Sequence, residues 1–254
     1  MKNNIKVVVI ESPYDTYQDS KEVRDLMGRV WKMKLDGYKL HYPYGIMPVS
    51  EIDFFANHVI LCEEIQGELF PFAGSRSIST TQCKKSRIEF PVIEHLFQSI
   101  SKEAEPLLQA TKNWINNKEK KNEIIGYNSS WTMCPRVLES DHLKTLARDL
   151  SMAMYYYYYT SYNIPNIITA AASRFKVDRI QKEMGFEYVK DEFNNNFSDF
   201  TSRAFFEQKC FMMILNNNQF PLEFIRKAKE FKKYWDNRVV FEDTTSVEDF
   251  DQVA

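Results

Sequence analysis

One segment decides the fold, and it spans Glu123–Phe186: EIIGYNSSWTMCPRVLESDHLKTLARDLSMAMYYYYYTSYNIPNIITAAASRFKVDRIQKEMGF. Its first part, Glu123–Met133, predicts a strand that ends before Pro135. A long amphipathic helix follows, and Ser140 or Asp141 caps its start. A helix that begins directly after a strand favours anions, because its free backbone N–H groups and its dipole both attract negative charge. The segment therefore predicts an anion site at this helix start.

The second half of the segment returns to the sheet. Asn163–Pro165 stops the long helix. The small apolar residues of Ile167–Ala172 predict a central strand, because they carry no charge. The spacing of apolar residues over Val177–Met184 predicts a short helix that Gly185 closes. The segment thus runs strand, helix, strand, helix.

The N-terminal part adds more of the same elements. Ile5–Ile10 predicts a first strand, and the apolar rhythm from Thr16 to Asp36 predicts a helix with Gly37 just past its end. Gln66-Gly67 predicts a hairpin turn, since glycine tolerates a positive φ. Arg76 falls on the second strand of this hairpin.

The C-terminal part completes the sheet. We expect a helix over Pro91–Trp114, strands at Glu187–Val189 and Phe211–Leu215, and a last helix from Pro221 to Trp235. Strands and helices interleave without a long linker, which favours an α/β fold with a single mixed, mostly antiparallel sheet flanked by helices. We predict one domain over residues 1–241 and an acidic, frayed tail over residues 242–254.

The composition bounds the class of protein. The 254 residues include 33 basic and 35 acidic side chains, and this balance does not indicate nucleic acid or an anionic membrane as a partner. The hydrophobic fraction of 44% is enough for a sizeable core. The longest apolar tract, Met152–Tyr159, is too short to span a bilayer, and the N-terminal apolar stretch is too short for a signal peptide. We therefore expect a cytoplasmic protein without a membrane span.

Metal binding has little support in the sequence. The four cysteines are widely spaced, and the four histidines form no H-x-x-x-H pattern or Cys/His cluster. We expect reduced cysteines, no metal site and no tightly bound cofactor.

The order of elements and the stretch Lys182-Glu183-Met184-Gly185-Phe186 resemble the GNAT acyltransferase superfamily. The resemblance implies that the strand–turn–helix receives the phosphopantetheine arm of a thioester donor, with Arg136 and Ser140 as its binding residues. The family's glycine-bearing phosphate loop would fall at Arg136–Asp141, where this chain has no glycine. The chain is more similar to the acyl-homoserine-lactone synthases and N-acyl amino acid synthases of this superfamily. These enzymes take the acyl group mainly from acyl carrier protein, whose arm carries one phosphodiester, so they tolerate a poor pyrophosphate site.

The N-terminal half resembles the same branch. The matching residues are Arg24, Trp31, Gly37-Tyr38, Glu51-Ile52-Asp53 and Gly74-Ser75-Arg76. The resemblance implies that Arg24, Asp53 and Arg76 share a charged cluster near the acceptor amine, with Trp31 among the substrate-binding residues. A structural ion-pair network is the alternative for these three charges.

N-acyl transfer needs an amine deprotonated near the thioester and a hydrogen-bond donor for the developing oxyanion. Asp53 and Glu89 are the candidate bases, with Arg76 as a further catalytic residue. Trp131 and Met133 are candidates for lining an acyl pocket, although such residues more often line a core.

Three hypotheses follow. The first is an N-acyltransferase that moves an acyl group from a phosphopantetheine thioester, on acyl carrier protein, to an amino acid or a homoserine-lactone-type amine. The second is an acyl-CoA-dependent N-acetyltransferase of a small amine or protein. The third is a catalytically silent binding module with the same fold.

Overall fold

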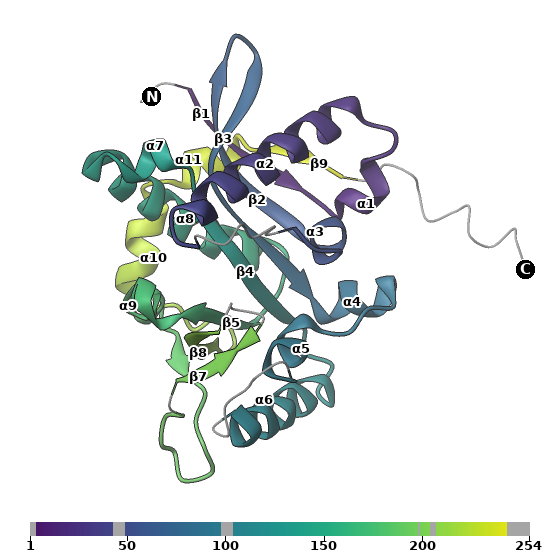
Figure 1. The fold of residues 1–254 in the computed structure, drawn as a ribbon, viewed down its shortest axis with the longest axis vertical. Coiled ribbons are helices and arrows are strands. Elements are labelled where there is room, and N and C mark those ends of the chain that lie inside the picture. Colours follow the sequence, from purple (N-terminus) through teal and green to yellow (C-terminus); the bar gives the residue numbers. More distant parts are fainter. Residues whose placement is uncertain (1–3, 43–48, 98–103, 198, 204–206, 243–254) are drawn as a thin grey trace, which may run out of the picture. The chain divides into compact units, whose positions relative to one another are not determined.

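The computed structural model describes residues 4–42, 49–97, 104–197, 199–203 and 207–242. The predicted acidic tail lies outside this range from residue 243 onward. The fold is shown in Figure 1.

The strands alternate with helices along the chain (Figure 1). The strands are β1 (Ile5–Ile10), β2 (Asn57–Ile65), β3 (Glu68–Ser79), β4 (Ile125–Met133), β5 (Asn166–Ala172), β6 (Glu187–Tyr188), β7 (Phe200–Ser202), β8 (Gln208–Leu215) and β9 (Val239–Phe241). The helices are α1 (Pro13–Thr16), α2 (Lys21–Lys39), α3 (Ile52–Phe55), α4 (Thr80–Ser86), α5 (Pro91–Phe97), α6 (Ala104–Glu119), α7 (Pro135–Leu138), α8 (Asp141–Ser161), α9 (Val177–Glu183), α10 (Leu222–Lys229) and α11 (Lys232–Asp236), with a 3-10 turn η1 (Ser173–Phe175).

The described strands form one mixed sheet in the order β6-β8-β5-β4-β3-β2-β1-β9, with β7 paired to β8. Strand β1 pairs antiparallel with β2 and parallel with β9, while β5 pairs parallel with β4 and antiparallel with β8. Strands β6 and β7 also pair antiparallel with β8. The predicted mixed, mostly antiparallel sheet is confirmed.

The chain divides into two compact units. Unit 1 contains residues 1–76, 131–147 and 236–254, and unit 2 contains residues 77–130 and 148–235. In unit 1, helix α2 packs its apolar face against β1 and β2; the core includes Val8, Ile10, Val23, Leu26, Met27, Val30, Ile60 and Cys62. This is the helix face that the spacing of apolar residues predicts.

The prediction that Gly37 lies just past the end of the helix is wrong. It does not end the helix: α2 continues to Lys39, and Gly37 is a buried helical residue. A Cβ at this position would lie 2.7 Å from both the carbonyl oxygen of Met133 and Cγ2 of Thr132. The glycine therefore allows α2 to approach the end of β4 closely.

The hairpin prediction is confirmed. Strands β2 and β3 are joined by Gln66 and Gly67, whose φ values are 54° and 82°. Two consecutive positive φ angles are what a tight two-residue hairpin requires. Arg76 lies on β3 as expected.

Several boundaries differ from the sequence prediction. Within the helix expected over Pro91–Trp114, the described residues form α5 and the start of α6, and residues 98–103 lie outside the described range. The last helix is divided into α10 and α11. Strands β7 and β9 have no counterpart in the prediction, because three residues are too short for a periodic signal.

Candidate functional site

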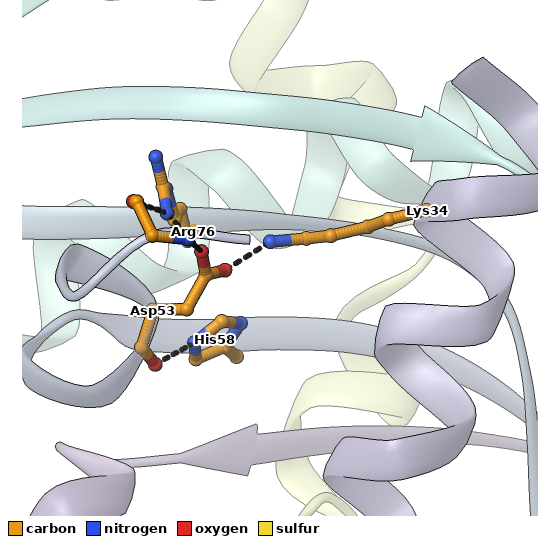
Figure 2. A network of polar contacts seen from close by, with 5 residues as sticks. Lys34, Asp53, His58 and Arg76 are labelled. Carbon is orange, nitrogen blue, oxygen red and sulfur yellow. Dashed lines mark hydrogen bonds and ion pairs between the residues drawn. The ribbon is translucent and has the colours of Figure 1, made fainter. Parts of the chain in front are cut away.

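Unit 1 contains a buried network of charged side chains (Figure 2). Nζ of Lys34, on α2, and Nη1 of Arg76, on β3, both donate to the carboxylate of Asp53, on α3. The backbone N–H of Ser50 donates to the same carboxylate at 2.9 Å, and Arg76 also donates to Oγ of Ser50 at 3.1 Å. Nε2 of His58, on β2, lies 2.7 Å from the backbone oxygen of Asp53. Figure 2 shows Lys34 and Arg76 reaching Asp53 from different elements.

This Asp53 network is almost completely removed from solvent. Asp53 is 0% exposed, His58 1%, Lys34 2% and Arg76 7%. Buried charges are costly unless they are paired and hydrogen-bonded, and Asp53 meets both conditions. The network therefore depends on this single carboxylate.

Burial and neighbouring charges alter the titration of three groups. Burial lowers the pKa of Lys34 to about 8, although the charge of Asp53 opposes this change. Burial alone would raise the pKa of Asp53, but the charges of Lys34 and Arg76 outweigh it and leave the pKa below its usual value. Burial and the nearby charge of Lys34 lower the pKa of His58 to about 3, so its ring is neutral near pH 7.

Two cations thus share one anion in the Asp53 network. With His58 neutral, the four side chains Lys34, Asp53, His58 and Arg76 together carry one positive charge when Lys34 is protonated. A buried excess of positive charge favours a ligand that brings a carboxylate or another anion. It also favours deprotonation of Lys34 to a neutral amine.

The structure brings Asp53 and Arg76 together and leaves Arg24 elsewhere. The guanidinium of Arg24 donates to the backbone oxygens of Tyr17 and Gln18, at the end of α1, and takes no part in the Asp53 network. Lys34 supplies the second cation instead. The expected three-residue cluster is therefore wrong in one member.

Sequence reasoning missed Lys34, although a signal was present. Lys34 lies four residues after Val30 and seven after Met27, on the apolar stripe of α2. A lysine in line with buried residues needs a partner charge. That pattern predicts a buried ion pair even without a structure.

Trp31 lies beside the same region of unit 1. Its ring packs with Tyr17 and Phe54, at centroid distances of 5.9 Å and 5.5 Å. Its Nε1 is buried and has no hydrogen-bond partner within the described residues. An indole N–H can only donate, so Trp31 keeps a buried donor without an acceptor among the described residues.

Trp131 and Met133 lie near the end of β4. Thr132, between them, contacts Gly37 of α2, and side chains alternate along a strand, so both point to the opposite face. Both are partly exposed, and Nε1 of Trp131 is buried without a partner in the described chain. Their assignment to an acyl pocket stays a prediction.

The expected donor-binding residues have partners of their own. Arg136 forms an exposed ion pair with Glu63 at 2.9 Å, and Oγ of Ser140 accepts from the backbone N–H of Leu143 at 3.4 Å, as an N-cap does. Glu89 is exposed in the segment that joins α4 to α5, in unit 2. The binding and catalytic roles of these three residues stay predictions.

Unit 2 contains the divergence of two central strands. The β4–β5 ladder runs from the pair Ile125–Asn166 to the pair Asn128–Thr169 and ends there. Strand β4 continues beyond it, and Ser130 has a φ of 55°, in the left-handed region. Strand β5 continues to Ala172 and pairs there with β8. A non-glycine residue in this conformation is strained, and such strain is concentrated at functional sites.

The described residues contain neither a metal-binding cluster nor a helix suited to a membrane. No three His, Cys, Asp or Glu side chains gather closely enough there to hold a metal ion. None of the helices described combines the length and apolarity that a membrane crossing requires.

Comparisons with solved structures identify proteins of the same fold. The CoA-dependent acyl-homoserine lactone synthase BjaI, solved with SAM and isopentyl-CoA, matches with a TM-score of 0.54 at 11% identity, covering 93% of this chain and 92% of that chain. FeeM, an N-acyl amino acid synthase from uncultured soil microbes, matches with a TM-score of 0.52 at 10% identity, covering 92% and 94%. No family model and no curated protein sequence matches. The fold predicted from Glu123–Phe186 is thus confirmed as the fold of these acyl-transferring synthases.

Proposed function

From a fold shared with acyl-transferring synthases, we propose that this protein is an N-acyltransferase. It moves an acyl group from a phosphopantetheine thioester to the amine of an amino acid or a homoserine-lactone-type acceptor. The observation that carries the proposal is the divergence of β4 from β5 after Asn128 and Thr169, with the strained residue Ser130 just beyond. Fold alone does not determine function, and the chemistry that these two strands can support is what favours acyl transfer.

Diverging strands suit a thioester donor for two reasons. The phosphopantetheine arm carries amides and can align with a strand as an added strand does. Backbone N–H groups of a central strand can also stabilise the oxyanion that forms when an amine attacks the thioester carbonyl. The new C–N bond forms as the C–S bond breaks, and the thiol leaves with a proton from the amine.

The Asp53 network is the proposed acceptor-binding region. Its excess positive charge suits an acceptor that carries a carboxylate, which an amino acid does and a simple amine does not. Trp31, with its unpartnered N–H, adds a donor in the same unit. Asp53 itself is paired with two cations, which favours a role in positioning over a role as the base.

The donor is proposed to be acyl carrier protein, with acyl-CoA as the alternative. The helix start after Pro135 has no glycine, and its Arg136 is paired with Glu63. Such a site is poorly equipped for a pyrophosphate and is sufficient for a single phosphodiester. BjaI is described as CoA-dependent, so both donors belong in the test.

The test is release of free thiol from acyl carrier protein and acyl-CoA donors of several chain lengths, with amino acids and amines as acceptors. Product mass identifies the acylated amine. Release from the carrier-protein donor with an amino acid supports the proposal, whereas release from CoA alone indicates an ordinary acetyltransferase. No release from any donor and acceptor pair would indicate a binding module.

Arg76→Ala provides the matched variant. Lys34 still neutralises Asp53 in this variant, so the fold should persist while turnover falls sharply. Arg226→Ala, at an exposed arginine of α10, is the control that should keep full turnover. An Arg76→Ala protein that unfolds would show that the Asp53 network is structural.

A further inference from the structure

A buried amide stands at the last pair of the β4–β5 ladder. Gln181, on α9, is 8% exposed, and its Nε2 donates to Oγ1 of Thr169 at 3.2 Å. Thr169 is 3% exposed and is the β5 residue in register with Asn128, where the ladder ends. The amide of Gln181 is therefore fixed at the point where the two strands stop pairing.

The other end of this amide is unsatisfied. Oε1 of Gln181 is buried and has no hydrogen-bond partner within the described chain. A buried acceptor without a partner costs free energy, and native proteins rarely keep one without a reason. Because Oε1 and Nε2 share one carbon atom, Oε1 also lies close to the end of the ladder.

The chemistry of the amide limits the group that it can receive. Oε1 is a neutral acceptor, so its partner must carry an N–H or O–H. A buried ammonium would lose its hydration and gain no opposite charge from an amide, so a neutral donor fits better. The thioester donor of the proposed function carries such groups, because its arm contains secondary amides.

Resting on the proposed function, we propose that Gln181 is a positioning residue that accepts a hydrogen bond from the amide N–H next to the sulfur of the thioester donor. The thioester end of the phosphopantetheine arm enters first between β4 and β5, because the carrier at the other end of the arm stays outside. The amide nearest the sulfur therefore comes closest to the last pair of the ladder. The contact fixes the thioester before the amine attacks.

The test is a cycle between a protein change and a ligand change. The two donors are an N-acetylcysteamine thioester and its analogue with oxygen in place of the amide N–H, which keeps the shape and removes the donor. The wild-type protein should favour the amide in kcat/KM by about fivefold to tenfold, the worth of one hydrogen bond. Gln181→Met should lose this preference, because methionine accepts only weakly.

Two further variants separate this role from a structural one. Thr169→Val keeps the shape of the side chain but frees the amide of Gln181, so it should also reduce the preference. Gln109→Met, at an exposed glutamine of α6, should retain it. The melting temperature of Gln181→Met should change little, because removing the unsatisfied acceptor offsets the loss of the hydrogen bond to Thr169.

The outcomes are distinct. Equal preference for the amide in the wild type and in Gln181→Met would overturn the inference, and so would an equal loss of rate by the variant with both donors. If the wild type turns over no thioester at all, the proposed function fails first.

Discussion

At the scale of single residues, Asp53 and Lys34 should contribute unequally to the stability of the Asp53 network. Asp53 accepts hydrogen bonds from two cations and from the backbone N–H of Ser50. Removing the carboxylate charge leaves Lys34 and Arg76 buried together, whereas removing Lys34 leaves a balanced pair. The two changes should therefore differ strongly in cost.

We expect Asp53→Asn to lower the free energy of unfolding by about 3–5 kcal/mol, because it leaves buried charges uncompensated. Lys34→Met should lower the free energy of unfolding by less than about 2 kcal/mol. The methionine side chain fills similar space, and Arg76 still pairs with Asp53. Urea unfolding of both variants measures the difference. Equal costs would contradict the idea that Lys34 is the surplus cation.

His58 makes stability depend on pH. Its folded pKa is about 3, because burial disfavours the charged ring, while the unfolded value is about 6.5. As pH falls below about 6.5, the unfolded chain binds a proton that the folded chain refuses, so stability falls. Asp53 acts in the same direction, since its folded pKa is also lowered.

His58→Gln removes the contribution of His58 to this pH dependence and leaves that of Asp53. Its free energy of unfolding should decrease less than that of the wild type between about pH 6.5 and pH 4.5. Urea unfolding at several pH values measures both slopes. An equally steep decrease in the variant would mean that His58 does not titrate differently in the folded state.

At the scale of elements, Tyr159 links helix α8 to the strands of unit 2. Tyr159 is 0% exposed, and its ring occupies the space that a Cβ at Gly126 would need. Its hydroxyl lies 2.6 Å from Oγ of Ser77, on β3. Tyr157 and Tyr158, the two preceding residues of α8, are buried too.

Tyr159→Phe should cost about 1–3 kcal/mol, because it leaves the buried hydroxyl of Ser77 without its partner. Adding Ser77→Ala should recover part of that loss, with a coupling of about 1 kcal/mol in a double-mutant cycle. Thermal or urea unfolding of the four proteins gives the coupling. Strictly additive losses would refute a specific bond.

Local patterns predict some elements well and miss others for physical reasons. Gln66-Gly67 and the apolar stripe of α2 depend on near neighbours in the chain, so their signals are complete in the sequence. Strand β9 has three residues and owes its existence to β1, far away in the chain. No local pattern contains that information.

The candidate site shows the same limit. The sequence identifies Asp53 and Arg76, whose spacing resembles a known pattern, and the structure joins them. The prediction that Arg24 joins the same network is wrong, because Arg24 contacts backbone oxygens instead. The sequence alone does not show whether an arginine pairs with a carboxylate or with the backbone. Gln181 carries no charge, and the structure marks it by its burial and by an oxygen without a partner among the described residues.

At the scale of the whole molecule, β9 covers one edge of the sheet. It pairs in parallel with β1 over Val8–Ile10, and the backbone N–H of Glu11 donates to the oxygen of Phe241 at 2.8 Å. An uncovered edge presents unpaired N–H and C=O groups, which invite pairing with other chains. The three residues of β9 therefore protect the Val8–Ile10 half of this apolar strand.

A chain that stops after Asn237 should lose β9 and expose this edge of β1. We expect a lower free energy of unfolding and concentration-dependent aggregation, which light scattering measures. A chain that stops after Glu242 keeps β9 and serves as the control. If both truncated chains stay monomeric and equally stable, β9 does not protect the edge.

The pairing of β1 with β9 also affects how the protein is made. The ribosome synthesises β1 at Ile5–Ile10 and β9 only at Val239–Phe241, so β1 waits for its outer partner while all the residues between them are made. Nascent chains on one messenger RNA lie close together during that time, each with the same open strand. Chaperones that shield nascent apolar segments should matter more for this protein than for one whose edge strands are synthesised one after the other.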